Sequence, residues 1–279
     1  FKEEMVETCS QGEFTIIVFG VTLLISLTCV IVVALGLWFG FPVAMRSMTG
    51  RRIEEVCRRQ KLIALTFDDG PVPGMTERVL EVLDELGVKA TFFMIGSLVE
   101  KNEDLARQVI DKGHQVASHT QNHLDAWRVG PILGIGDVRS GMRSMKDREL
   151  AVSWFRPPRG NATLGTVLSC WLQGCRMIWW THDSGDTGFG SGRIDMGIPQ
   201  ILKKMVTGGK KSVSTEDVMC PEKREGLLCS LEETGGVVLL HDGKRTYEGY
   251  QELTLECTRD IVSRGKNKGF RFVTLNELK

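Results

Sequence analysis

Net charge is the first property that this 279-residue sequence lacks, because 35 Lys and Arg residues balance 35 Asp and Glu residues. No overall field attracts nucleic acid or an acidic polymer, so we expect no nucleic-acid partner and a substrate that is neutral or recognised locally. An internal repeat and a low-complexity tract are also absent. With 42% hydrophobic and 25% charged residues, the chain has the composition of one large globular domain with an appendage.

A C-x-x-C pair is missing too, although the chain has eight cysteines. The spacing of Cys220 and Cys229 suits either a small disulfide loop or two free thiols, and both interpretations stay open. The cysteines therefore do not identify the cellular compartment.

Charged residues do not occur between Phe14 and Met45, a stretch long enough to cross a membrane as a helix. At a rise of about 1.5 Å per residue the helix exceeds the roughly 30 Å hydrocarbon core, so it would tilt or place Trp38 in the interface. A signal peptide would have a basic leader, a shorter apolar region and a clean cleavage site, and none of these is seen. We predict a tail over 1–13 and a membrane helix over 14–45, with membrane lipid as a partner, in preference to a signal peptide or a core helix.

The side of the membrane on which the rest of the chain lies stays open. Because the sequence begins at Phe1 rather than Met, basic residues upstream would change any count of flanking charge. We expect a single-pass membrane protein. By the positive-inside rule, the domain after the span is placed in the cytoplasm by a basic cluster, which consists of Arg46, Arg51, Arg52, Arg58, Arg59 and Lys61.

Short apolar runs alternate with helical periodicity in the remainder of the chain, which predicts a parallel α/β sheet or barrel. Residues 46–60 are interpreted as a basic juxtamembrane linker, helical from Gly50 to Gln60, and 61–279 as one domain with a surface insertion at Gly208–Glu225. The predicted strands are Lys61–Phe67, Ala90–Gly96, His114–His119, Met177–Trp180, Val237–Leu240 and Phe270–Leu275. The predicted helices are Met75–Leu86, Glu103–Lys112, Ile198–Val206 and Leu253–Arg264.

Polar residues stand at the carboxyl ends of these strands, where reactive side chains gather in parallel α/β folds. His119 and His123 are four residues apart, so on a helical turn both rings would face one metal ion. Taken alone, this spacing is more often a surface coincidence. The adjacent acids Asp68 and Asp69 alone would equally cap a helix. Together, one carboxylate and two imidazoles with open positions indicate a hydrolytic metal site, with the second carboxylate placed to take a proton from water.

Five motifs in order extend this pattern from about Lys61 to Leu278: TFDDGP at 66–71, HTQNH at 119–123, RPPRG at 156–160, WTHDSGD at 180–186 and LLHD at 239–242. With them the chain resembles the polysaccharide deacetylases of the NodB-homology type, also called carbohydrate esterase family 4. Each of the last three motifs is weak alone, whereas five in sequence are specific. The resemblance implies an α/β fold of the distorted (β/α)7-barrel type, which here follows the membrane helix. It also suggests an extracytoplasmic domain, whereas the flanking charges suggest a cytoplasmic one.

The resemblance also implies a role for each matching residue. Asp69, His119 and His123 would bind a divalent ion, usually zinc. Asp68 would be the general base, and His241 the general acid that protonates the leaving amine.

Further residues of the motifs are assigned in the same way. Arg156 resembles the arginine that pairs with the base, ideally through a bidentate guanidinium, and Asp183 resembles the carboxylate that orients the acid histidine. An ordinary buried ion pair is the alternative for both. Substrate contacts fall to Pro158, to Arg159 with its backbone N–H as an oxyanion donor, and to Leu240 as a wall of the acetyl pocket.

Two departures from the family pattern affect the sugar-contacting surface. Arg159 replaces a common aromatic residue, and Thr187 stands where an exposed Trp commonly ends the fourth motif. Trp127 or Trp154 would be substitute stacking platforms, although each is more often a core residue. The remaining histidines match no ligand position and are expected to be structural: His114 and His182.

The predicted function is metal-dependent hydrolysis of N-acetyl groups from an N-acetylglucosamine-containing glycan of the chitin or peptidoglycan type. An O-acetyl esterase acting on a xylan-like glycan is the close alternative, because the same chemistry cleaves an acetyl ester. A membrane-tethered barrel that binds glycan without turnover, and a metal-independent amidohydrolase, are more distant alternatives. The complete set of acids and histidines speaks against both.

Overall fold

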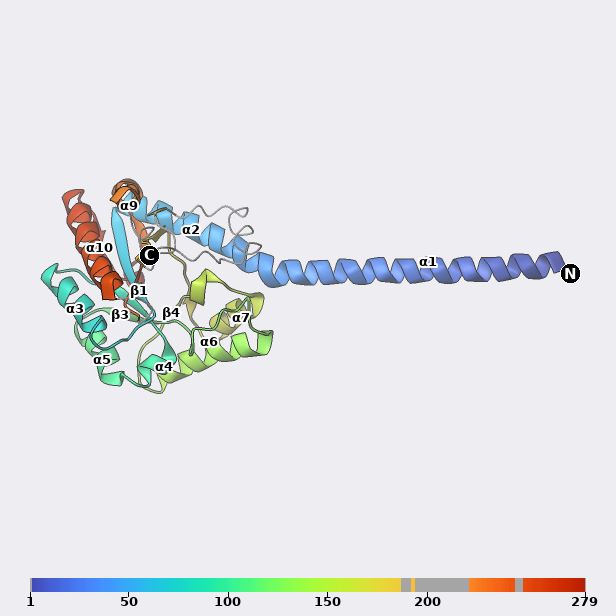
Figure 1. The fold of residues 1–279 in the computed structure, drawn as a ribbon, viewed down its shortest axis with the longest axis horizontal. Helices are drawn as coiled ribbons and strands as arrows, with labels where there is room; N and C mark the ends of the chain where they lie inside the picture. The colour runs from blue at the N-terminus through green and yellow to red at the C-terminus, as the bar shows by residue number, and fades with distance from the viewer. Residues whose placement is uncertain (1, 187–191, 194–220, 244–247, 279) are drawn as a thin grey trace.

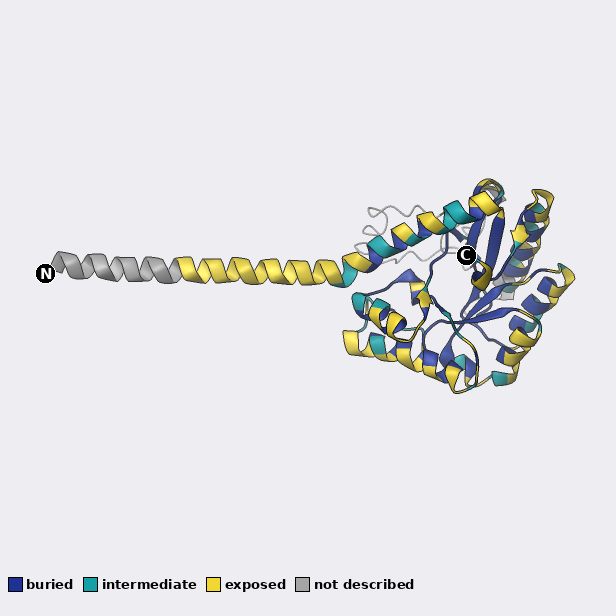
Figure 2. Ribbon diagram, turned by 180° about the vertical axis from the view of Figure 1, so that it is seen from behind, coloured by how far each residue is buried: buried dark blue, intermediate teal, exposed yellow. Residues whose placement is uncertain are grey.

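The computed structural model describes residues 2–186, 192–193, 221–243 and 248–278. A long helix, α1 (Lys2–Leu35), extends away from the body of the molecule and continues through a π-helical turn, η1 (Gly36–Gly40), into α2 (Phe41–Gln60) (Figure 1). The helical run from Val18 to Gln60 contains an apolar window that is long enough to cross a membrane and is not buried against the domain. Figure 2 shows this exposed surface on the part of α1 that leads into the domain.

A curled, mostly parallel sheet forms the body of the domain. Its strand order is β5-β4-β3-β2-β1-β8-β6-β7, with β9 also paired to β1, and the β6–β7 pair is antiparallel. The strands are β1 (Leu62–Asp68), β2 (Thr91–Met94), β3 (Gln115–Ser118), β4 (Trp154–Phe155), β5 (Arg176–Met177), β6 (His182–Asp183), β7 (Gly192–Arg193), β8 (Gly236–His241) and β9 (Arg271–Phe272).

Helices surround the sheet and leave one side of the half-barrel open (Figure 1). They are α3 (Thr76–Glu85), α4 (Gly96–Val99), α5 (Glu103–Asp111), α6 (Pro131–Lys146), α7 (Leu164–Leu172), α9 (Pro221–Thr234) and α10 (Glu248–Asn267), with short 3-10 turns η2 (Pro158–Gly160) and η4 (Leu275–Glu277).

Most of the predicted elements are present, with one clear correction. The strand predicted at Met177–Trp180 is wrong, because pairing in β5 ends at Met177 and the following residues cross between β5 and β6. Trp179 donates its indole N–H to the Gly160 carbonyl at 3.0 Å, which holds this crossing inside the barrel. The predicted helix Ile198–Val206 and most of the insertion Gly208–Glu225 lie outside the described residues.

The strand alternation of β1 separates two cores and positions the polar site. Ile63, Leu65 and Phe67 belong to the core between sheet and helices, whereas Leu62 and Ala64 belong to the core inside the barrel. By the same alternation, Thr66 and Asp68 point inward. The interior is therefore apolar at the amino ends of the strands and polar at their carboxyl ends.

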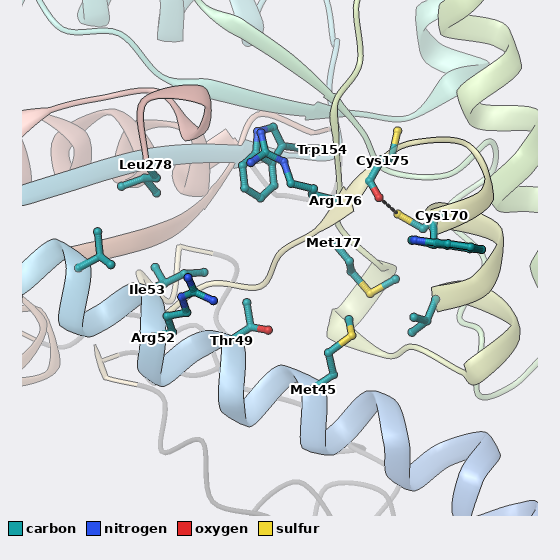
Figure 3. Close-up of a pocket in the computed structure, with 13 residues that line it drawn as sticks. Met45, Thr49, Arg52, Ile53, Trp154, Cys170, Cys175, Arg176, Met177 and Leu278 are labelled. Atoms are coloured by element: carbon teal, nitrogen blue, oxygen red, sulfur yellow. Dashed lines mark hydrogen bonds between the residues drawn. The ribbon is translucent and has the colours of Figure 1, made fainter.

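The segment predicted as a linker forms most of α2 and packs into the open side of the half-barrel. Cys57 is fully buried in the inner core, and the buried Arg46 lies with its Nη1 3.4 Å from the Gly160 carbonyl and its guanidinium 5.0 Å from the centre of the Trp180 ring. Between α2 and α7 remains a cavity of about 540 Å³, lined on one side by Met45, Thr49 and Ile53 (Figure 3). A truncation inside α2 would therefore remove part of the domain.

Candidate metal and catalytic site

The two motif histidines lie in an irregular loop, not on a helical turn as predicted. His119 follows β3 directly. Between it and His123 the backbone turns sharply, because Thr120 and His123 have left-handed φ angles of 67° and 58°. This loop path brings the ring centroids to 5.0 Å. Left-handed backbone at non-glycine residues is strained, and such strain clusters at functional sites.

Asp69 completes the cluster from the turn after β1, where its own φ is 75°. One of its carboxylate oxygens, Oδ1, lies 3.0 Å from His123 Nε2 and 3.4 Å from His119 Nε2. All three ligand atoms lie within 4.8 Å of one another. Two ligands that share a metal ion at about 2.0 to 2.1 Å stand about 3.0 to 3.4 Å apart, so the spacing fits one ion.

The tautomer of His119 is determined by its neighbour. The ring atom Nδ1 lies 2.8 Å from the Arg156 carbonyl, which only accepts, so Nδ1 carries the proton. The lone pair of Nε2 is therefore directed at the cluster, as in known metal sites. Although burial favours the neutral acid, the His119 and His123 rings that face the carboxylate outweigh burial and hold the pKa of Asp69 well below its ordinary value.

Asp137 on α6, a residue that carries no sequence signal, holds the histidine loop in place. Its buried carboxylate accepts from the Asn122 backbone N–H at 2.9 Å, the Asn122 side chain at 3.1 Å and the Leu124 backbone N–H at 3.1 Å. Both backbone donors flank His123. The carboxylate thus fixes the direction in which the His123 ring leaves the loop.

Replacing Asp137 with Ala should weaken divalent-metal binding about 10- to 100-fold, the range for loss of a group that orients a ligand. The reason is that the two amides beside His123 lose their acceptor. Competition with a fluorescent metal indicator measures the affinity. Asp137→Asn keeps one carbonyl acceptor and should fall between wild type and Asp137→Ala; equal affinities in all three proteins would contradict the role.

Asp68 and Arg156 form a buried ion pair beside the cluster. Arg156 is fully buried, and its Nη1 donates to Asp68 Oδ1 at 2.7 Å and to Thr66 Oγ1 at 2.8 Å. The expected pairing is thus present, but through one nitrogen and not as a bidentate fork. The guanidinium also lies 4.0 Å from the centre of the Phe93 ring, which packs it on one face.

The carboxylate that holds His241 is Asp186, which corrects the assignment of Asp183. Asp186 Oδ1 lies 2.8 Å from His241 Nδ1, and Oδ2 accepts from the His241 backbone N–H at 2.8 Å and from Thr254 at 2.9 Å. Asp183 ends β6, and Asp186 reaches the histidine from the loop behind it. Burial lowers the pKa of His241, but the charge and hydrogen bond of Asp186, with the Asp69 and Asp68 charges, outweigh it and raise this pKa to about 10.

Asp186→Asn should move the alkaline limb of the activity profile to lower pH by about 1 to 3 units, because it removes the charge that keeps His241 protonated. Stability has a pH dependence of its own, because the pKa of His241 in the folded protein lies above the ordinary value of 6.5. The protonated His241 ring therefore stabilises the fold fully below about pH 6.5, and this contribution is lost as the pH rises through about 10. The measurement is kcat/KM for acetate release against pH. Asp183→Asn is the matched control and should leave the limb in place; the reverse result would restore Asp183.

The fifth motif also requires a correction. Leu240 lies in the core between sheet and helices, so it is not a wall of the site; Leu239 points to the opposite face and packs with Trp180 inside the barrel. Asp242, the last residue of this motif, to which the sequence assigned no role, is buried and accepts from Thr76 Oγ1 at 2.7 Å. Burial, together with the Asp69 and Asp68 charges, raises the pKa of Asp242 to about 7 despite this hydrogen bond.

The third motif forms the tight turn η2. Arg159 has a left-handed φ of 57°, and its half-exposed side chain lies 3.8 Å from the Asp125 carboxylate. Asp125 also accepts from Asn161 at 2.9 Å, which ties the turn to the histidine loop. Pro158 is buried in the turn, so of these residues the Arg159 side chain is the one that reaches solvent.

The other residues singled out in the sequence have structural surroundings. Trp154 is buried, with its indole N–H bonded to Asn276, and Trp127 donates its indole N–H to the Ala162 carbonyl. Both remaining histidines are buried, and Cys229 is an exposed free thiol, whereas Cys220 and Thr187 lie outside the described residues. The hydrogen-bonding partners of these histidines are Ala90 N–H for His114, and Thr181 and Ser230 for His182.

Known proteins resemble this chain in sequence and in fold. A profile described as polysaccharide deacetylase matches residues 55–170. The chain is 31% identical over 234 residues to a peptidoglycan-N-acetylglucosamine deacetylase of Bacillus cereus, covering 82% of this chain and 93% of the relative. It is 52% identical over 224 residues to a chitooligosaccharide deacetylase of Rhizobium leguminosarum bv. trifolii, covering 77% and 81%. The fold matches a chitin deacetylase of Colletotrichum lindemuthianum with a TM-score of 0.60 at 24% identity over 78% of this chain and 87% of that chain, which confirms the predicted barrel type.

Proposed function

Because this chain belongs to the polysaccharide deacetylase family, we propose that it hydrolyses N-acetyl groups of an N-acetylglucosamine-containing glycan, with Asp68, Asp69, His119, His123 and His241 as its catalytic centre. The observation that carries the proposal is the juxtaposition of an Asp-His-His cluster with a buried carboxylate–arginine pair and a carboxylate–histidine pair. One metal ligand set, one base and one acid are the groups that amide hydrolysis needs.

The donor set fits a divalent ion, and we propose zinc. One carboxylate oxygen and two imidazole nitrogens, with the tautomer of His119 fixed by a carbonyl, are the usual protein ligands of catalytic zinc. When bound, the ion would polarise the acetyl carbonyl and acidify the attacking water.

The side chains of the site divide the proton transfers between them. Asp68 accepts the proton of the attacking water, and Arg156 holds this carboxylate in one orientation. His241 donates a proton to the departing amine. Asp186 keeps His241 protonated until then, and the Arg159 backbone N–H, presented by the η2 turn, is the proposed donor to the oxyanion.

The substrate class follows from the relatives and from the surface near the site. The two relatives described above are named for peptidoglycan N-acetylglucosamine and for chitooligosaccharides. We propose a glycan of this kind, recognised in part by the half-exposed Arg159 side chain, which lies in the η2 turn formed by the third motif. A guanidinium there would suit polar or acidic groups beside the reacting sugar.

The test of the proposed function is acetate release by the purified full chain in detergent. N-acetylglucosamine oligomers, peptidoglycan fragments and acetyl xylan are assayed with and without a chelator, followed by addition of zinc. We expect release from the N-acetylated substrates, loss with chelator and recovery with zinc. Preference for acetyl xylan would indicate an O-acetyl esterase, and no acetate from any substrate with metal bound would reject the enzyme.

We further propose that α1 crosses a membrane and anchors the domain to it. The apolar window is exposed along its length, and the helix continues into α2, which is part of the domain. Protease treatment of sealed vesicles that contain the full chain would show the side: protection of the domain inside them assigns it to the lumen of the vesicle.

A further inference from the structure

The exposed apolar residues outside α1 and its end are concentrated on two neighbouring helices. In the described part of the chain that follows Phe41, the exposed large hydrophobic residues are those of this set together with Met48 and Ile110, which lie on other helices. We call the concentrated set the apolar patch; its members and exposed fractions are Ile132 (86%), Leu133 (63%), Leu168 (48%), Trp171 (71%) and Leu172 (75%).

The helix α7 has its apolar face turned outward. Leu168, Trp171 and Leu172 stand at i, i+3 and i+4, so they form one stripe on its exposed side. The buried side carries small or polar residues instead, namely Gly165, Thr166, Ser169 and Cys170. No charged residue occurs in the helix. A surface helix in water has the opposite arrangement, so the outer face of α7 is built for an apolar surrounding.

The apolar patch is continuous with the end of the proposed membrane span. Trp38 in η1 and Ile135 in α6 both press on Gly165 at the start of α7, so closely that an added Cβ would lie 2.9 Å and 2.8 Å from them. Figures 1 and 2 show α6 and α7 beside the point where the long helix meets the domain. Leu172 lies seven residues from Gly165, about 10 Å along the helix axis.

We propose that the apolar patch inserts into the interfacial layer of the lipid bilayer that α1 crosses, so that the domain is held at two points. This inference rests on the proposed span. Lipid is the occupant that the position favours, because the patch is exposed on helices that contact the end of the proposed span, and interfacial helices bury an apolar face of this kind at the headgroup boundary. Trp171 also favours lipid as the occupant, because tryptophan side chains are enriched in the interfacial layer of bilayers.

A second attachment point has a consequence for the catalytic site. The third motif ends at Gly160, five residues before the Gly165 contact with Trp38, and Arg46 of α2 reaches the Gly160 carbonyl. Seating of α7 on the bilayer therefore keeps this side of the site near the membrane surface. Acetylated glycan presented close to the membrane would be the accessible substrate.

The fluorescence of Trp171 reports whether the patch contacts lipid. The full chain is reconstituted in nanodiscs of phosphatidylcholine and phosphatidylglycerol, with or without lipids brominated near the headgroup. The difference between wild type and Trp171→Phe isolates the emission of Trp171, which we expect to fall at least about twofold with brominated lipid, as for an interfacial Trp. The double variant Leu168→Glu/Leu172→Glu should lose this quenching while its thermal stability in detergent stays unchanged, because both side chains point outward.

Two results would overturn the proposal. Trp171 emission that is quenched by acrylamide but not by brominated lipid would place the patch in water. A dimer in detergent that the double variant dissociates, with Trp171 shielded from brominated lipid in nanodiscs, would assign the patch to a second copy. Carbonate washing of vesicles tests the proposed span separately from the proposed insertion of the patch. Extraction of the chain by carbonate would reject the span itself. A chain that resists extraction but shows no quenching of Trp171 would reject only the insertion of the patch.

Discussion

Asp68→Asn is expected to lower kcat for acetate release about 10²- to 10⁴-fold while the protein keeps its metal. The carboxylate lies 2.7 Å from Arg156 and beside the metal cluster, with its Oδ2 3.8 Å from His119 Nε2. An amide at this position still accepts from Arg156, but it no longer takes a proton from water. Single-turnover kinetics on N-acetylglucosamine oligomers and metal analysis of the same sample give the two readouts.

The control for Asp68→Asn is its partner in the ion pair. Arg156→Met removes the group that orients the base but leaves the base itself, so kcat should fall less than in Asp68→Asn. Because the buried Asp68 charge then lacks its partner, thermal stability should fall more. Retention of more than about a tenth of wild-type kcat by Asp68→Asn would show that another group is the base.

The grouping of Asp69, His119 and His123, our proposed metal cluster, was predictable from the sequence because these residues stand at or near strand ends. Asp69 follows β1 and His119 follows β3, and parallel pairing of β1, β2 and β3 brings these ends together. The position of His123 was predicted for the wrong reason, since left-handed backbone in a loop, and not a helical turn, brings it to the cluster. A spacing of four residues does not distinguish the two paths.

The partner of His241 was not predictable from the motif alone. WTHDSGD offers two acids three residues apart, and only the loop after β6 determines that Asp186 reaches the histidine. The inward direction of the Leu239 side chain, by contrast, could have been predicted from the sequence. If His241 points into the barrel, then the residue two positions earlier points the same way, and Leu240 faces the helices.

The role of α2 was hidden by its charge. Six basic residues between 46 and 61 suggest a solvated linker, yet Arg46 is buried against Trp180 and Cys57 lies in the inner core. A cation that stacks on an aromatic ring and approaches a carbonyl has no signal in hydropathy. Asp137 was missed for a similar reason: its partners are backbone amides of a distant loop, which no residue pattern identifies.

His123→Ala should abolish turnover by loss of the metal, with a fall in affinity larger than the about 10- to 100-fold expected when only an orienting group is removed. Its Nε2 lies 3.0 Å from Asp69 Oδ1, and only two ligands remain without it. Metal stoichiometry after dialysis against a weak chelator, and recovery of activity in excess zinc, are the measurements.

His114→Ala is the matched control, because that ring is also buried but bonds to the Ala90 N–H and does not belong to the cluster of Asp69, His119 and His123. The control should keep one metal ion per chain even if it unfolds at lower temperature. Together with Asp68→Asn, these variants separate ligand from base: one loses metal and turnover, the other turnover alone. Full metal content in His123→Ala would mean that the cluster of Asp69, His119 and His123 is not the metal site.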